Sequence, residues 1–139
     1  MTQNEKDLLL KDLCARLPYG VKIERYDTYY GAVSEIDETH NKIDYFRDFV
    51  GAIDITFLDK WIEEYNVKPY LFPLSSMTEW QEKELEELDP EFYTIINDNG
   101  TIECVMNNKT FDWFHKHHFD WRGLIPMGLA NDATGLNIY

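Results

Sequence analysis

The densest group of chemically active side chains lies near the C-terminus, where His115, His117 and His118 are followed by Asp120. Imidazole and carboxylate groups bind transition metals, and they also act as general acids and bases. Residues two apart on a helix point to nearly opposite sides, so His117 cannot share a face with His115 and His118. Histidines at a helix C-terminus are also favourable without any function. We therefore predict no metal and no cofactor, and keep an enzyme or metal protein centred on His115 to Asp120 as an alternative.

An acidic run covers residues 79–91, where seven carboxylates are offset by Lys83 alone. On a helix, Glu79, Glu82 and Glu86 line one side with about 5–6 Å between neighbours. A row with this spacing can imitate a line of phosphates, so an acidic nucleic-acid mimic that blocks a basic protein is one hypothesis. A cation-binding row and a solvated outer face are the others.

Motifs for nucleophilic catalysis are absent. The sequence has no G-x-S-x-G, no P-loop and no Rossmann glycine pattern. Ser75 and Ser76 are typical of helix caps. Cys104 followed by histidines offers a Cys–His pair, but so does any chain with these residue types. The sequence thus predicts no catalytic residue, and whether the chain is an enzyme stays open.

The first half of the chain predicts a helix followed by strands. Thr2 and Glu5 have capping-box spacing, and a Pro-Tyr-Gly sequence at 18–20 ends the helix. Residues 21–24 alternate between apolar and polar types, and residues 29–36 are rich in aromatic and β-branched residues. A polar turn is predicted at 38–41, and residues 43–49 after it alternate again. We expect an antiparallel sheet over 21–55. The predicted inner face of the helix consists of Leu9, Leu10, Leu13, Cys14 and Leu17.

The second half predicts short helices around a hairpin. A helix fits 56–65, and two prolines make 68–73 extended. Ser76 or Thr78 caps a helix that ends at Asp89-Pro90, and an Asn-Asp-Asn-Gly turn at 97–100 joins strands 92–96 and 101–106. Helices are expected at 110–118 and 122–130, before an irregular tail. The predicted inner side of the helix after Thr78 consists of Met77, Trp80, Leu85 and Leu88.

The closing block, residues 119–125, is expected to lock the structure rather than to act as an active site. Asp120 precedes a helical pattern, so its carboxylate can accept amide hydrogens at the helix start. Leu124 and Ile125 continue an apolar face. Arg122 can pair with an acid of the run at 79–91, bind an anion, or stack on an aromatic ring.

Composition limits the classes of function. The 139 residues are 44% hydrophobic and 15% aromatic, which predicts one acidic domain covering 1–139. A formal net charge of −13 repels phosphates and anionic membranes, so we expect no direct binding to nucleic acid or to a membrane. Two cysteines do not suggest a disulfide framework. With no signal peptide or apolar span in view, we expect the chain in the cytoplasm.

Three blocks carry a resemblance: LLLKDLCARLPYGVKI at 8–23, KPYLFPLSSMTEWQ at 68–81 and HHFDWRGLIPMGLA at 117–130. They resemble a family of small proteins encoded in gut Bacteroidales genomes and their phages or prophages. This sequence departs from the family pattern at Pro126 and in its tail. The family has no assigned activity, so the resemblance implies only an accessory protein of a mobile element that acts through other proteins.

Together these features predict an α+β fold with an N-terminal helix, a small antiparallel or barrel-like sheet, and helices packed on one side. The predicted function is a non-catalytic protein-binding accessory module of phage or mobile-element origin. Its predicted partner is a protein, and a basic protein is one hypothesis for it. The sequence does not indicate the oligomeric state. The predicted partner-binding residues are Glu79, Glu82, Glu86, Trp121 and Arg122.

Overall fold

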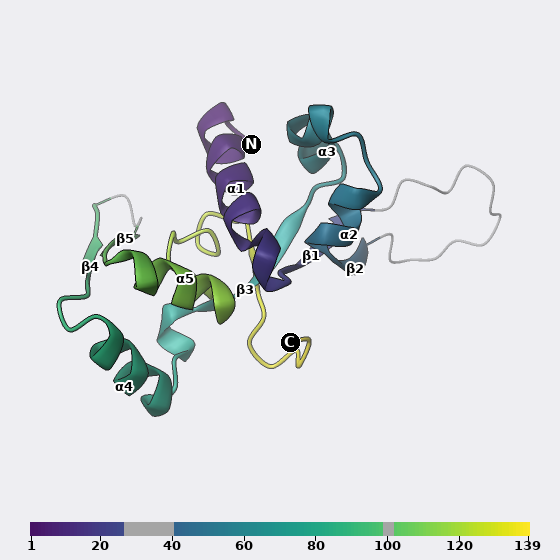
Figure 1. The fold of residues 1–139 in the computed structure, drawn as a ribbon. Helices are drawn as coiled ribbons and strands as arrows, with labels where there is room; N and C mark the ends of the chain where they lie inside the picture. The colour runs from purple at the N-terminus through teal and green to yellow at the C-terminus, as the bar shows by residue number, and fades with distance from the viewer. Residues whose placement is uncertain (27–40, 99–101) are drawn as a thin grey trace. The chain divides into compact units, whose positions relative to one another are not determined.

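The computed structural model describes residues 1–26, 41–98 and 102–139, and it confirms the α+β class (Figure 1). The described chain divides into two compact units, Met1–Tyr70 and Leu71–Tyr139. Strand β3 (Lys68–Pro73) begins in the first unit and ends in the second. The expected strand at 29–36 and most of the turn at 38–41 lie outside the described residues. Among the described helices, none is long and apolar enough to cross a membrane.

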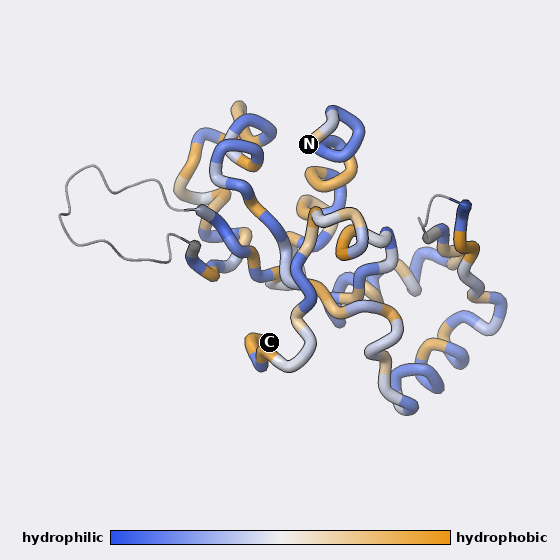
Figure 2. The backbone as a smooth tube through the Cα atoms, turned by 180° about the vertical axis from the view of Figure 1, so that it is seen from behind, coloured by the Kyte–Doolittle hydropathy of each residue, from blue (hydrophilic) through white to orange (hydrophobic). Residues whose placement is uncertain are grey.

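In the first unit, helix α1 (Gln3–Arg16) begins with the predicted capping box of Thr2 and Glu5. The tube of α1 changes between hydrophilic and hydrophobic along its turns (Figure 2). Its buried face is rotated from the predicted one: Cys14 is exposed, whereas Asp12 and Arg16 are buried beside Leu9 and Leu13. Arg16 Nε donates to Asp12 Oδ2 over 2.8 Å, and this bond offsets the burial of both charges. The prediction that Cys14 is buried was wrong.

Strands β1 (Lys22–Tyr26) and β2 (Asn41–Tyr45) pair antiparallel, and β1 also pairs antiparallel with the start of β3. The antiparallel sheet predicted over 21–55 is confirmed for β1 and β2. The strand expected at 43–49 was wrong beyond Tyr45, because helix α2 (Phe46–Gly51) begins there. Phe46 and Phe49 are both buried, and a spacing of three residues places them on one helical face. A short 3-10 turn, η2 (Ile55–Phe57), and helix α3 (Leu58–Glu64) fulfil the prediction of a helix at 56–65.

In the second unit, the end of β3 pairs in parallel with β6 (Phe119–Asp120) and also with β7 (Asn131–Asp132). The sheet containing β3 is therefore mixed, and no closed barrel occurs among the described residues. Helix α4 (Glu79–Leu88) starts with the Thr78–Gln81 capping box and ends at Asp89. Strands β4 (Tyr93–Ile96) and β5 (Ile102–Val105) form the predicted hairpin, whose turn lies partly outside the described residues.

Helix α5 (Asn108–Lys116) confirms the helix expected at 110–118, capped by the side chain of Asn107. Leu85 of α4 packs with Trp113, Phe114 and Phe119 in the core of this unit.

Two predictions for the second unit were wrong. Trp80 is 83% exposed, because it lies five positions and thus about 140° from Leu85 around the helix. Residues 122–130 form turns instead of a helix. Gly123 and Gly128 have φ values of 78° and 75°, which a right-handed helix does not contain. Pro126 lies exposed in these turns, so it breaks no helix.

Candidate functional site

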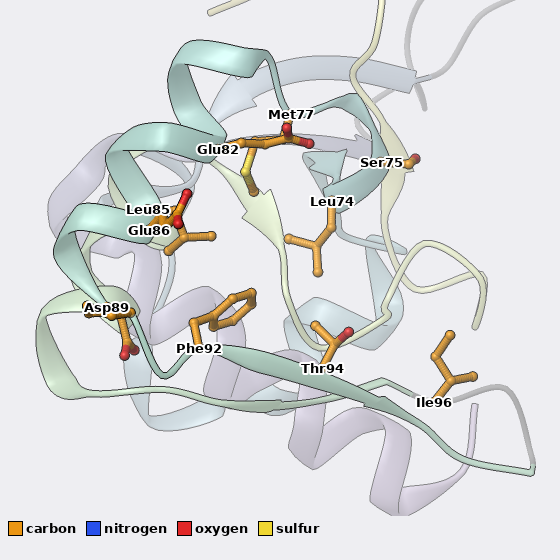
Figure 3. A pocket seen from close by; sticks show the side chains of 11 residues that line it. Leu74, Ser75, Met77, Glu82, Leu85, Glu86, Asp89, Phe92, Thr94 and Ile96 are labelled. Carbon is orange, nitrogen blue, oxygen red and sulfur yellow. The ribbon is translucent and has the colours of Figure 1, made fainter.

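An apolar groove with a volume of about 460 Å³ lies between α4 and β4 in the second unit. This size is typical of sites that bind small molecules or peptide side chains. Figure 3 shows Leu74, Met77 and Phe92 pointing into the space between the helix and the strand. The groove is lined by Leu74, Ser75, Met77, Glu82, Leu85, Glu86, Asp89, Pro90, Phe92, Thr94 and Ile96.

Local sequence explains why apolar and acidic groups meet in this groove. Leu85 faces the core, and Glu82 lies three residues before it on a neighbouring part of the helix surface. Glu86 lies four residues after Glu82, so the two glutamates border the same side of α4. On β4, successive side chains alternate between faces, which places Phe92, Thr94 and Ile96 together on the groove side. An apolar wall therefore lies directly beside two exposed carboxylates.

The third acid of the groove has a structural role. Asp89 is 6% exposed, and its Oδ2 accepts hydrogen bonds from the backbone N of Asn107 at 2.9 Å and from Thr110 Oγ1 at 3.0 Å. These bonds connect the end of α4 to the start of α5. The carboxylate of Asp89 therefore stabilises the fold, whereas Glu82 and Glu86 lie exposed on the rim of the groove.

The hairpin beside the groove presents apolar side chains on both of its faces. Ile96 is 75% exposed on the groove side, and Tyr93 is 53% exposed on the other side. Ile95 and Val105 are also exposed. Within the described residues, β4 pairs with β5 alone. A two-stranded ribbon with apolar faces gains stability when another surface covers it.

The three clustered histidines face different aromatic rings. His115 is buried, and its Nε2 accepts a hydrogen bond from Trp121 Nε1 at 3.1 Å. His117 lies against Trp113, where burial lowers the pKa of its imidazole. His118 adopts the left-handed conformation that ends α5, with φ 61°, and stacks on Tyr139. Among the described residues, no group of three or more His, Cys, Asp or Glu side chains could hold a metal ion.

Asp120 holds the turn that follows it. Its two carboxylate oxygens accept the backbone N–H groups of Leu124 and Ile125, each at 2.9 Å. The carboxylate therefore accepts amide hydrogens as expected, although the segment that it caps is a turn and not a helix.

Cys104 is held as a neutral thiol. Its Sγ donates to the carbonyl oxygen of Trp121 at 3.4 Å, and burial together with the charge of Asp120 raises its pKa to about 11. A cysteine nucleophile needs a thiolate, so this environment opposes the Cys–His hypothesis.

The structure brings some of the predicted partner-binding residues together. Glu82 and Glu86 share the groove, whereas Glu79 is exposed on α4 and is not among its lining residues. Trp121 packs edge-on against Phe111, with ring centroids 5.0 Å apart, and the guanidinium of Arg122 lies 4.0 Å from the centre of the Trp121 ring. Stacking on an aromatic ring, one of the three alternatives for Arg122, is thus present in the structure.

The sequence interpretation missed the apolar half of the groove, which consists of Leu74, Met77, Phe92 and Ile96. A usable signal was present: the strand at 92–96 has no charged residue on either face, which is unusual for a hairpin at a protein surface. Comparisons with protein-family models, with curated proteins and with solved structures find no match for this chain.

Proposed function

We propose that this chain is a non-catalytic protein-binding accessory module that binds its partner through the α4–β4 groove. The observation that carries the proposal is the apolar groove of about 460 Å³ beside an exposed apolar hairpin. Exposed apolar surface that is continuous with a hollow is typical of protein interaction sites. An origin in a phage or another mobile element is part of the proposal, supported by the resemblance of the three sequence blocks.

The composition of the groove favours binding over catalysis. Its eleven lining residues include no His, Cys, Lys or Arg, and one of its three acids, Asp89, is committed to the fold. A general acid–base pair or an activated nucleophile needs a second polar partner within hydrogen-bond reach. The groove can therefore bind a partner through its shape and its apolar surface.

The two alternatives have less support. A nucleic-acid mimic needs a continuous acidic surface, whereas Glu82 and Glu86 border an apolar wall. An enzyme centred on His115 to Asp120 needs groups that can reach a substrate. The His115 and Asp120 side chains both form hydrogen bonds within the protein.

Site-specific photo-crosslinking tests the proposal. A benzoylphenylalanine at position 96, in the groove, is compared with one at position 55, where Ile55 is 64% exposed in the first unit. Both variants are irradiated in the cells that encode the protein. We expect a discrete protein adduct at position 96 and none at position 55.

The matched exposure of the two positions controls for non-specific capture. Equal adduct patterns at both positions, or no protein adduct at position 96, would refute binding through the groove. A nucleic-acid adduct at position 96 would instead indicate a different class of partner.

A further inference from the structure

We propose that the natural occupant of the groove is a short segment of a partner protein that carries Lys or Arg beside large apolar side chains. This inference rests on the proposed function and adds the chemistry of the partner. Two rows of side chains border the groove, one apolar and one acidic.

The apolar row selects for apolar side chains. Leu74, Met77, Leu85 and Phe92 surround the hollow, and Ile96 extends the row along β4 (Figure 3). Removing such surface from water contributes roughly 25 cal/mol per Å². A hydrated metal ion or a simple polyamine cannot cover these walls. The occupant must therefore present apolar groups of its own.

The acidic row selects for positive charge. Glu82 and Glu86 lie one helical turn apart on the rim, and both are exposed. Helix α4 carries five glutamates and one lysine, and no lining residue is cationic. An acidic occupant would meet like charges at the rim, which costs binding free energy. A basic segment forms complementary pairs there.

A second copy of this chain fits these requirements poorly. Each copy has a formal net charge of −13, so two copies repel one another. The phosphates of a nucleic acid meet the same repulsion. A cationic and apolar segment of another protein matches both rows at once.

Selection from a random dodecapeptide library displayed on phage tests this inference, with the purified full chain as the target. The enriched peptides are then synthesised with a fluorescent label, and their Kd values are measured by anisotropy. The variants are Glu82→Gln combined with Glu86→Gln, and separately Ile96→Ser. A matched control combines Glu64→Gln with Glu87→Gln, which removes the same charge at exposed acids that do not line the groove.

We expect the enriched peptides to place Lys or Arg within a few residues of Leu, Ile, Phe, Met or Trp. Loss of the two rim charges should raise Kd by about 3- to 30-fold. Ile96→Ser should raise it by about tenfold, and the matched control by less than twofold.

The outcomes separate the two proposals. Enriched peptides without basic residues that still lose affinity in Ile96→Ser would overturn the cationic partner while keeping the groove as a binding site. Peptides that bind the rim variant and the matched control equally would overturn the role of Glu82 and Glu86. Failure to enrich any peptide, or self-association of the chain in sedimentation, would count against both proposals.

Discussion

Two polar regions of the second unit differ in where their polar groups point. In the closing block, residues 119–125, Asp120 and Trp121 form hydrogen bonds with protein atoms, and Arg122 stacks on a ring of the same block. In the α4–β4 groove, Glu82 and Glu86 lie exposed beside apolar walls. The polar groups of the closing block are used in folding, whereas the carboxylates of Glu82 and Glu86 are exposed at the groove. Exposure, more than residue type, distinguishes a candidate site here.

The first unit also contains polar groups that are bonded within the protein. Asp12 and Arg16 are fully buried and bonded to each other, and the Tyr70 hydroxyl donates to Glu24 at 3.2 Å. Burial and the charge of Glu24 raise the pKa of Tyr70 to about 12. These polar groups also stabilise the fold.

The largest expected effect on stability is that of Asp120→Ala. The change leaves two buried or half-buried N–H groups, those of Leu124 and Ile125, without their charged acceptor. The free energy of unfolding should fall by about 2–4 kcal/mol, and Asp120→Asn should cost about half as much because one acceptor oxygen remains. Urea denaturation measures both. Wild-type stability for both variants would contradict the structural role of the closing block.

The alkylation rate of Cys104, whose thiol donates to the carbonyl oxygen of Trp121 in the closing block, tests the packing of the same region. A pKa raised from 9.0 to about 11 lowers the thiolate fraction at pH 8 by roughly a hundredfold. A thiolate of higher pKa is also the stronger nucleophile, which offsets part of this loss. Iodoacetamide should therefore modify Cys104 at least about tenfold more slowly in the folded chain than in urea. Mass spectrometry of both cysteines measures the rates, with exposed Cys14 as the internal reference. Alkylation of native Cys104 as fast as that of Cys14 would contradict the enclosed thiol.

The same pKa has a consequence for stability at high pH. The unfolded chain releases the Cys104 proton at a lower pH than the folded chain does. The folded state should therefore lose stability as the pH rises from about 9 towards about 11. Cys104→Ala should remove this part of the pH dependence.

The smallest expected effects compare two acids of the same groove. Asp89→Ala should lower the free energy of unfolding by about 1–2 kcal/mol, because Asn107 and Thr110 lose an acceptor. Glu86→Gln should change it by less than about 0.5 kcal/mol, since its carboxylate is exposed. Thermal melts of the two variants measure the difference. Equal destabilisation by the two changes would show that Glu86 also stabilises the fold, and would contradict its assignment as a partner-binding residue.

Much of the fold was predictable, because local chemistry decides it. Capping residues fixed the starts of α1 and α4, and alternation at 21–24 indicated β1. The failures have physical causes. The buried Asp12–Arg16 pair rotated the inner face of α1, which no scale of apolar residues predicts. Gly123 and Gly128 turned the chain at 122–130 where apolar spacing suggested a helix.

The candidate site was predicted only in part. Glu82 and Glu86 were expected on one side of α4, because helical spacing alone places them there. Leu74 and Ile96, which complete the groove, were not predicted. They lie 22 residues apart in the sequence and meet only through tertiary packing, so no local pattern brings them together.

An NMR titration of the methyl-labelled chain with a peptide selected from the library tests whether the groove binds a partner while the closing block only stabilises the fold. We predict that the methyl signals of Leu74, Leu85 and Ile96 shift with a common Kd, while those of Leu124 and Ile125 stay in place. Shifts that are largest at Leu124 and Ile125, with the groove signals unchanged, would contradict the claim.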